Sequence, residues 1–294
     1  MRYSGGAAEG AGGGAGAVCE CWGQAGRGGS LMSINPVINK NTSQERDDVE
    51  INPAIGAWFK KYRESYEWPH RTGRKESEKI IQTLNSSVQL AISQRQEKVI
   101  AASLVDIHRW KTNNRSGITT EYQKSLNSKK AEYFIEIFNL SPFDTNEKLG
   151  ILIGKLKIPN CNLPVCSAMA SYIYNRKNVP ILDRFVAQFF LKDFDVGDVD
   201  EDIKLVLQYV KKIPFKLEDG GNGNIRLSVY TSFGFEENLN KYIKIFVPEC
   251  NRIAQDLYKS KIKYCDIQGN LNDFFPVDVE MAVFSYAMKH SDLF

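Results

Sequence analysis

The sequence is poor in the residues that usually build metal and cofactor sites. Its three histidines are far apart, at positions 70, 108 and 290, and its six cysteines, at positions 19, 21, 161, 166, 250 and 265, form no CxxC pair. Structural zinc sites usually draw on closely spaced thiolate or imidazole pairs, and an iron–sulfur cluster needs four thiolates. We therefore expect no metal held by side chains, no iron–sulfur cluster and no required cofactor.

The sequence also lacks an apolar run long enough for a membrane helix or a signal peptide. Its scattered thiols are typical of a reducing compartment, where Cys161 and Cys166 would fill small gaps in the core. We therefore expect an intracellular protein, in the cytoplasm, nucleoid or nucleus according to the host. The sequence indicates no membrane partner and no obligate protein partner.

Large apolar residues are scarce at the N-terminus. The first thirty residues hold half of the chain's 22 glycines and cannot bury enough surface to fold alone. We interpret residues 1–50 as a disordered glycine-rich tail and linker, and residues 51–294 as the folded domain. Translation from Met1 and translation from Met32 are both compatible with this pattern.

What the sequence does contain is helical periodicity. Apolar residues recur at three- and four-residue spacing in most segments after residue 51, which predicts an all-α protein. The expected helices cover residues 76–93, 97–110, 129–140, 147–157, 165–174, 200–212, 235–261 and 278–290. We expect Pro248 to kink or divide one of them, Asp278 to cap the last, and residues 224–230 to form a short strand or an irregular crossing.

A helical hairpin is expected between residues 147 and 174. The first helix should end at Ile158, because the residue before Pro159 is displaced from the α region. Asn160 and Asn162 tolerate tight turns and cap helices, and Pro164 suits the first turn of the next helix. The hairpin would expose backbone N–H groups that can bind a phosphate oxygen, and the candidates are Asn160, Cys161, Asn162, Leu163 and Val165. The alternative is an ordinary connection between two core helices.

Asp183 is the candidate catalytic residue. It opens an apolar segment, 183–190, where the side chain can cap the helix. Apolar neighbours would raise the pKa of the carboxyl unless hydrogen bonds offset the cost of burial. Such a group can act as a general base or stabilise positive charge on a sugar, and it can do so while capping the helix.

The chain resembles the helix-hairpin-helix (HhH-GPD) DNA glycosylase superfamily over roughly residues 50–290. The specific part of the resemblance is the stretch 147–190, with its hairpin followed by an aspartate. Asn160 and Asn162 stand where the family usually has glycines. Pro164 stands where bifunctional members have a catalytic lysine, which excludes a Schiff base at that position. The resemblance implies a fold of two helical lobes, double-stranded DNA as the partner, and hydrolytic release of a damaged or modified base by Asp183. It also implies a possible monovalent cation on the hairpin's backbone carbonyls.

A glycosylase must also hold a base that has been rotated out of the DNA stack. Trp110 and Lys111, at a predicted helix end, are candidates for the base pocket or its rim, as are Tyr172 and Arg176 shortly before Asp183. Trp110 can equally be a core anchor with Lys111 in solvent.

Basic residues near aromatic ones form two groups that can line a DNA groove or simply face solvent. One group surrounds Tyr62 and includes Arg63 and Arg74, and the other flanks Trp110. The net charge of +3 does not by itself indicate nucleic acid. Two alternatives to a glycosylase therefore remain, namely a non-catalytic DNA-binding protein and a helical interaction protein unrelated to DNA.

Overall fold

The computed structural model describes residues 50–68, 73–113, 116–129, 131–139, 145–159, 161–174, 176–191, 200–219, 225–227 and 232–291. All of them belong to one unit that spans residues 48–294. Residues 1–49 of the predicted tail and linker and Asn160 lie outside the described residues.

The described residues are mostly helical, as predicted. The α-helices are α1 (Pro53–Arg63), α2 (Arg74–Ser93), α3 (Glu97–Lys111), α4 (Ser116–Asn127), α5 (Ala131–Asn139), α6 (Asn146–Leu156), α7 (Leu163–Ile173), α8 (Arg184–Leu191), α9 (Glu201–Tyr209), α10 (Ser232–Lys241), α11 (Val247–Lys259) and α12 (Pro276–Lys289). A 3₁₀ turn, η2 (Arg176–Asn178), precedes α8, and a π-helical turn, η3 (Tyr242–Phe246), joins α10 to α11.

Two short antiparallel hairpins interrupt the helical pattern. β1 (Leu217–Asp219) pairs with β2 (Ile225–Leu227), and β3 (Lys263–Cys265) pairs with β4 (Leu271–Asp273). The strand expected at 224–230 is confirmed in its central part. The β3–β4 hairpin was not predicted, because three-residue strands carry too little periodicity to be recognised.

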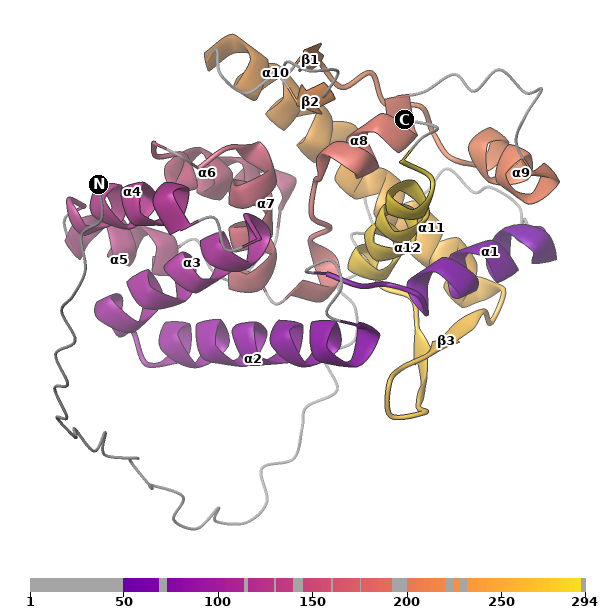
Figure 1. Cartoon of the computed structure of the whole chain (residues 1–294), viewed down its shortest axis with the longest axis horizontal. Coiled ribbons are helices and arrows are strands. Elements are labelled where there is room, and N and C mark those ends of the chain that lie inside the picture. Colours follow the sequence, from indigo (N-terminus) through magenta and orange to yellow (C-terminus); the bar gives the residue numbers. More distant parts are fainter. Residues whose placement is uncertain are drawn as a thin grey trace, which may run out of the picture. The chain divides into compact units, whose positions relative to one another are not determined.

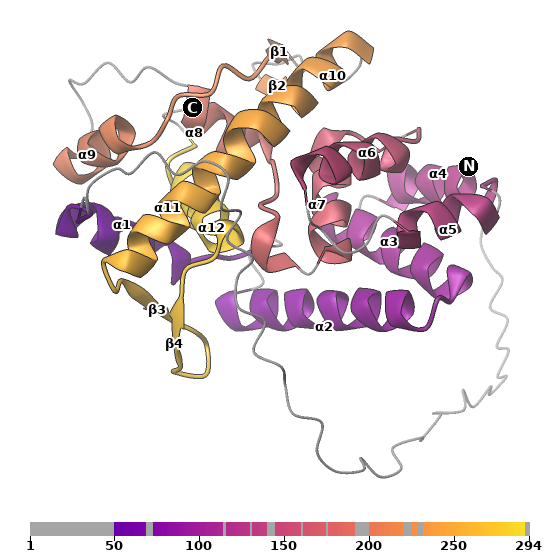
Figure 2. The same ribbon diagram turned by 180° about the vertical axis from the view of Figure 1, so that it is seen from behind.

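The helices gather into two groups within this unit (Figures 1 and 2). Helices α2–α7 pack around α3 and α7. In the second group, α1, α8 and α11 pack around α12, while α9 packs against α1, and α10 continues into η3. The groups meet where α6 contacts η3 and where η2 contacts α12. The chain begins the second group with α1, forms the first group, and then returns.

Helix α12 lies in the interior of its group, with every residue from Pro276 to Ala287 buried. It packs against α1, α8 and α11. Aromatic rings join these elements, since Trp58 lies 5.3 Å from Tyr286 and 5.9 Å from Phe189 between ring centroids. Burial of such large rings is the main source of stability in this part of the molecule.

The predicted hairpin is confirmed as α6 and α7. The Asn162 side chain caps α7 by accepting the Val165 N–H at 3.3 Å, and Pro164 lies in the first turn. Cys161 and Cys166 fill the core as expected, with their sulfur atoms 3.3 Å apart. Gly150 lets α6 approach η3 closely, because a Cβ there would lie 2.8 Å from Cδ1 of Ile243.

The predicted helix at 235–261 is divided, as expected from its proline. Pro248 has no N–H to donate to the preceding turn, and the helix widens into η3 immediately before α11. The last helix begins earlier than predicted, with Phe275 at the N-cap position. Asp278 caps the helix as expected, but from the first turn, where its Oδ2 accepts the Phe275 N–H at 3.0 Å.

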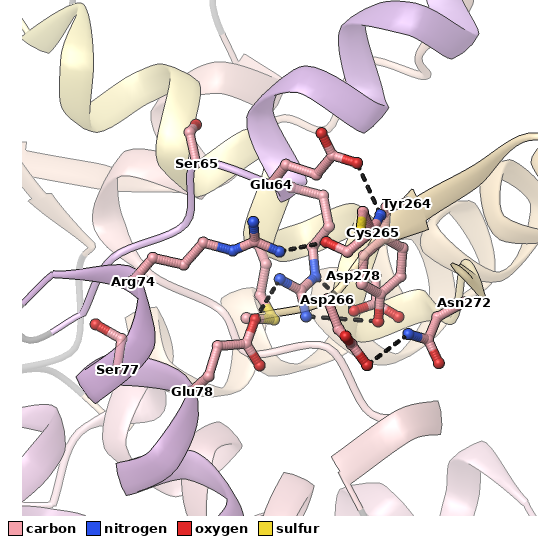
Figure 3. A network of polar contacts seen from close by, with 12 residues as sticks. Glu64, Ser65, Arg74, Ser77, Glu78, Tyr264, Cys265, Asp266, Asn272 and Asp278 are labelled. Carbon is pink, nitrogen blue, oxygen red and sulfur yellow. Dashed lines mark hydrogen bonds and ion pairs between the residues drawn. The ribbon is translucent and has the colours of Figure 1, made fainter. Parts of the chain in front are cut away.

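A buried arginine joins three elements that are distant in sequence. Arg63 donates from Nε to Asp278 Oδ1 at 2.6 Å and from Nη1 to Glu78 Oε1 at 2.8 Å, and its guanidinium lies over the Tyr264 ring. Figure 3 shows this network continuing outward through Arg74, which donates to the Cys265 carbonyl. Neither of the two predicted roles of Arg63, in a DNA groove or in solvent, is correct.

We predict that Arg63→Met destabilises the protein by roughly 3–5 kcal/mol, because it leaves two buried carboxylates without their cation. Urea unfolding followed by circular dichroism measures this change. Arg109→Met is the matched control, since Arg109 pairs with Asp106 at the exposed surface and its loss should cost less than about 1 kcal/mol. Equal costs for the two variants would show that the buried network contributes little.

Candidate functional site

The segment between η2 and α8 is held in place by α7 and η3. Leu182 donates its N–H to Ser167 Oγ at 3.1 Å, and Ser171 Oγ donates to the Val179 carbonyl at 2.6 Å. From the other side, the Tyr242 hydroxyl donates to the Pro180 carbonyl at 2.7 Å. The second helix of the hairpin therefore fixes the position of the next residue, Asp183.

Asp183 caps α8 and also forms a buried ion pair. Its Oδ1 accepts the Phe185 N–H at 3.1 Å, which confirms the predicted capping role. Its Oδ2 accepts a hydrogen bond from Lys111 Nζ at 2.8 Å. Only 14% of the Asp183 side chain and 7% of the Lys111 side chain are exposed.

The electrostatic surroundings keep Asp183 ionised. Burial alone would raise the pKa of this carboxyl, but Lys111, the Phe185 N–H and Arg184 together hold the pKa below its ordinary value. The sequence indicated that hydrogen bonds must offset the effect of burial on the pKa of Asp183, and Lys111 makes the largest such contribution. The result is a sheltered carboxylate rather than a neutral acid.

Lys111 is the last residue of α3, and two tryptophans position it: Trp110 beside it in the chain and Trp68 before α2. Trp68 donates from Nε1 to the Trp110 carbonyl at 3.3 Å, and Lys111 Nζ lies 5.8 Å from the centroid of the Trp68 ring. These contacts direct the ammonium toward Asp183. The alternative that placed Lys111 in solvent is wrong, since it lies inside the molecule.

Trp110, Tyr172 and Arg176 also lie close together, although none of them is an exposed rim residue. Trp110 is 6% exposed, Tyr172 is fully buried and Arg176 is 6% exposed. Arg176 donates to the Tyr172 hydroxyl, and its guanidinium lies 5.5 Å from the Trp110 ring centroid. The core position weighed for Trp110 is therefore correct, and it lies near the candidate catalytic residue.

Glu280, which the sequence analysis missed, completes this set from α12. It is 3% exposed, and burial raises its pKa to about 7, although Lys111 and Arg176 act in the opposite direction. The ionisable groups that interact electrostatically with it are Tyr66, Lys111, Tyr172, Arg176, Asp183, Tyr242 and Cys250. One signal was available, since Glu280 is an acid between valine and methionine in a helix whose residues are mostly apolar.

We use the name acid–base cluster for Lys111, Arg176, Asp183 and Glu280. Lys111 and Asp183 are paired, while Glu280 lies within electrostatic range of the other three. The cluster brings together the end of α3, η2, the start of α8 and the first turns of α12. It can hold a carboxylate in ionised form beside a second carboxyl that exchanges a proton near neutral pH.

The hairpin presents fewer free amides than predicted. The Cys161 N–H donates to the Ile158 carbonyl at 2.9 Å, and the Val165 N–H is taken by the Asn162 side chain. The prediction that Cys161 and Val165 bind phosphate is therefore wrong, because local capping already uses their N–H groups. Leu163 is the first residue of α7, so its N–H has no intrahelical acceptor, but the residue is fully buried. Asn162 beside it is exposed.

Within the described ranges, no group of three His, Cys, Asp or Glu side chains is arranged to hold a metal ion, and no helix is long and apolar enough to cross a bilayer. Comparison of the chain with family models, curated proteins and solved structures found no match. The geometry of the acid–base cluster and of the hairpin is therefore the basis for inferring function.

We predict that Glu280→Gln stabilises the protein more at pH 8 than at pH 5. The unfolded carboxyl loses its proton near pH 4.5, whereas the folded one keeps it until about pH 7, so wild-type stability falls as the pH rises between these values. The free energy of unfolding of the variant, relative to wild type, should increase by about 2–3 kcal/mol over this range. Urea unfolding at both pH values measures it.

Glu236→Gln is the control, because Glu236 is an exposed acid on α10. Its difference from wild type should hardly change with pH. A flat pH response for Glu280→Gln as well would mean that Glu280 titrates like an exposed glutamate.

Proposed function

We propose that the chain is a monofunctional DNA N-glycosylase with a two-lobed fold of the helix-hairpin-helix type. It would hydrolyse the bond between deoxyribose and a damaged or modified base in double-stranded DNA. The observation that carries the proposal is the rigid link between the hairpin and an ionised carboxylate. Ser167 and Ser171 of α7 bond the segment that delivers Asp183, so a helix that grips DNA would also place the carboxylate.

The chemistry of Asp183 suits glycosidic hydrolysis. Each carboxylate oxygen has one hydrogen-bond donor, Phe185 for Oδ1 and Lys111 for Oδ2, and retains a lone pair for a water molecule. The carboxylate can orient that water or stabilise the positive charge that develops on the sugar. Neither step needs a cofactor.

Lys111 has a positioning role in this proposal. It keeps Asp183 ionised and fixes its rotamer, because the ammonium itself is held by the Trp68 ring. The position in the hairpin where bifunctional relatives carry lysine is Pro164, so the hairpin supplies no amine for a Schiff base.

DNA binding would use the start of α7. The positive end of the helix dipole favours a phosphate at the exposed Asn162, whereas Leu163 beside it is fully buried. A monovalent cation on the backbone carbonyls of the hairpin, implied by the family resemblance, would add to this contact. Because capping already uses the Cys161 and Val165 amides, the grip is weaker than a glycine-rich hairpin provides.

The shielding of Asp183 favours a second candidate, a DNA-binding protein without catalysis. Only 14% of its side chain is exposed, and Lys111 pairs with one of its oxygens. In that case the hairpin would bind duplex DNA, and Asp183 would act only as a cap and ion-pair partner. The two experiments below separate these functions.

We predict that Asp183→Asn lowers base release by a factor on the order of a hundred or more while duplex affinity stays nearly unchanged. Asparagine keeps the cap on Phe185 but removes the negative charge. Alkali-revealed abasic sites, in duplexes with oxidised, deaminated or alkylated bases, measure release. Asp200→Asn, at the N-cap of α9, is the control and should retain activity. Normal release by Asp183→Asn would refute the catalytic role, and thermal unfolding excludes loss of the fold.

A second prediction concerns the hairpin. Asn162→Asp keeps a good helix cap but places a negative charge beside the expected phosphate, so duplex affinity should fall by about 1 kcal/mol at low salt. Thr145→Asp makes the same kind of change at the N-cap of α6 and should have a smaller effect. Fluorescence anisotropy over a salt series measures both. Equal affinities, or a wild-type affinity that does not change with salt, would exclude phosphate binding at the hairpin.

A further inference from the structure

Three buried polar atoms, two of them in the acid–base cluster and one next to it, have no hydrogen-bond partner among the described residues. They are Oε2 of Glu280, Nη2 of Arg176 and Nε1 of Trp110. Each belongs to a side chain that is at least nine-tenths buried. An unsatisfied buried donor or acceptor costs free energy, and native structures rarely contain several near one another.

These atoms belong to neighbouring side chains. The Arg176 guanidinium lies 5.5 Å from the Trp110 ring and 5.1 Å from the Tyr172 ring. Glu280 interacts electrostatically with Arg176, and η2 packs against α12. Nevertheless, Arg176 and Glu280 form no direct ion pair in the part of the chain that the structure describes. Two donors and one acceptor on side chains of this region thus remain without partners among the described residues.

A ligand that satisfies all three atoms must offer two hydrogen-bond acceptors, for Arg176 and Trp110, and one donor, for Glu280. A ring N–H between two carbonyl groups has this composition, and it is found in the imide of uracil and thymine. Adenine offers one donor and one acceptor on its pairing edge and would leave a buried donor unpaired. The rings of Trp110 and Tyr172 add aromatic surface suited to a flat heterocycle.

We propose that Glu280, Arg176 and Trp110 form a recognition subsite for an imide edge, in which Glu280 accepts the ring N–H while Arg176 and Trp110 donate to the carbonyl oxygens. The inference rests on the proposed function and narrows its substrate class. Glu280 and Arg176 act as specificity residues in this subsite, whereas Asp183 serves hydrolysis. Because the subsite is buried, entry of a base requires the surrounding side chains to separate.

Two small molecules test the subsite without DNA. 1-Methyluracil keeps the ring N–H and carries a methyl group where the sugar would be, whereas 1,3-dimethyluracil lacks that N–H. Isothermal titration of the full chain at pH 8, where Glu280 is ionised, should show that 1-methyluracil binds at least roughly tenfold more tightly, because the dimethyl compound leaves Glu280 unpaired. Equal affinity for the two compounds, or no binding of 1-methyluracil at millimolar concentration, overturns the proposal.

Two variants distinguish recognition from a structural role. Glu280→Leu should abolish the preference for 1-methyluracil, whereas Glu280→Gln should retain most of it, since an amide oxygen can also accept the N–H. Thermal unfolding verifies that both variants are folded. A preference that persists in Glu280→Leu means that another group reads the edge, and the assignment to Glu280 then fails.

Base release by the wild-type protein separates this inference from the proposed function. Release of uracil or mismatched thymine from duplexes supports both and identifies which source of the imide edge is used. Release of alkylated adenine, together with equal affinity for the two uracils, overturns the subsite and leaves the glycosylase in place. A preference for 1-methyluracil without release from any duplex supports the subsite and overturns the proposed hydrolysis.

Discussion

The burial of two carboxylates on one helix is the constraint on which much of this structure depends. Helix α12 is enclosed along most of its length, yet it carries Asp278 and Glu280 in its first turns. An ionised carboxylate cannot remain in such a position without a compensating charge. Cations must therefore come from other elements, and the long side chains of Arg63, Lys111 and Arg176 bring them.

This compensation determines how distant segments meet. Arg63 satisfies Asp278 from α1 and also reaches Glu78 on α2, so one guanidinium fixes three helices. On the other side of α12, the cations near Glu280 come from the end of α3 and from η2. The two helical groups are thereby held together by charge as well as by apolar contact. A buried ion pair adds little net stability, but it disfavours other arrangements in which the charges would be unpaired.

The features that could be predicted from the sequence are those that depend on residues close together in the chain. The hairpin, the caps at Asn162 and Asp183 and the interruption before Pro248 all follow from local backbone chemistry, and each was found. The sequence did not predict the pairing of Arg63 with Asp278, which are 215 positions apart, or of Lys111 with Asp183, 72 positions apart. Such pairs depend on tertiary packing, and no local pattern records them. Lys111 was a candidate for the pocket, but its partner could not be known.

The two acids of α12 differ in a way that bears on function. Asp278 has its cation and the Phe275 N–H, so its burial is fully compensated. Glu280 lies only two residues away, but it has one unpaired oxygen and a pKa raised to about 7. The fold can satisfy a buried carboxylate on α12 completely, as it does for Asp278. The missing hydrogen bond at Glu280 Oε2 is therefore not a consequence of the fold itself. A site that holds donors and an acceptor ready for a ligand gives up stability in the free protein, and the ligand restores it on binding.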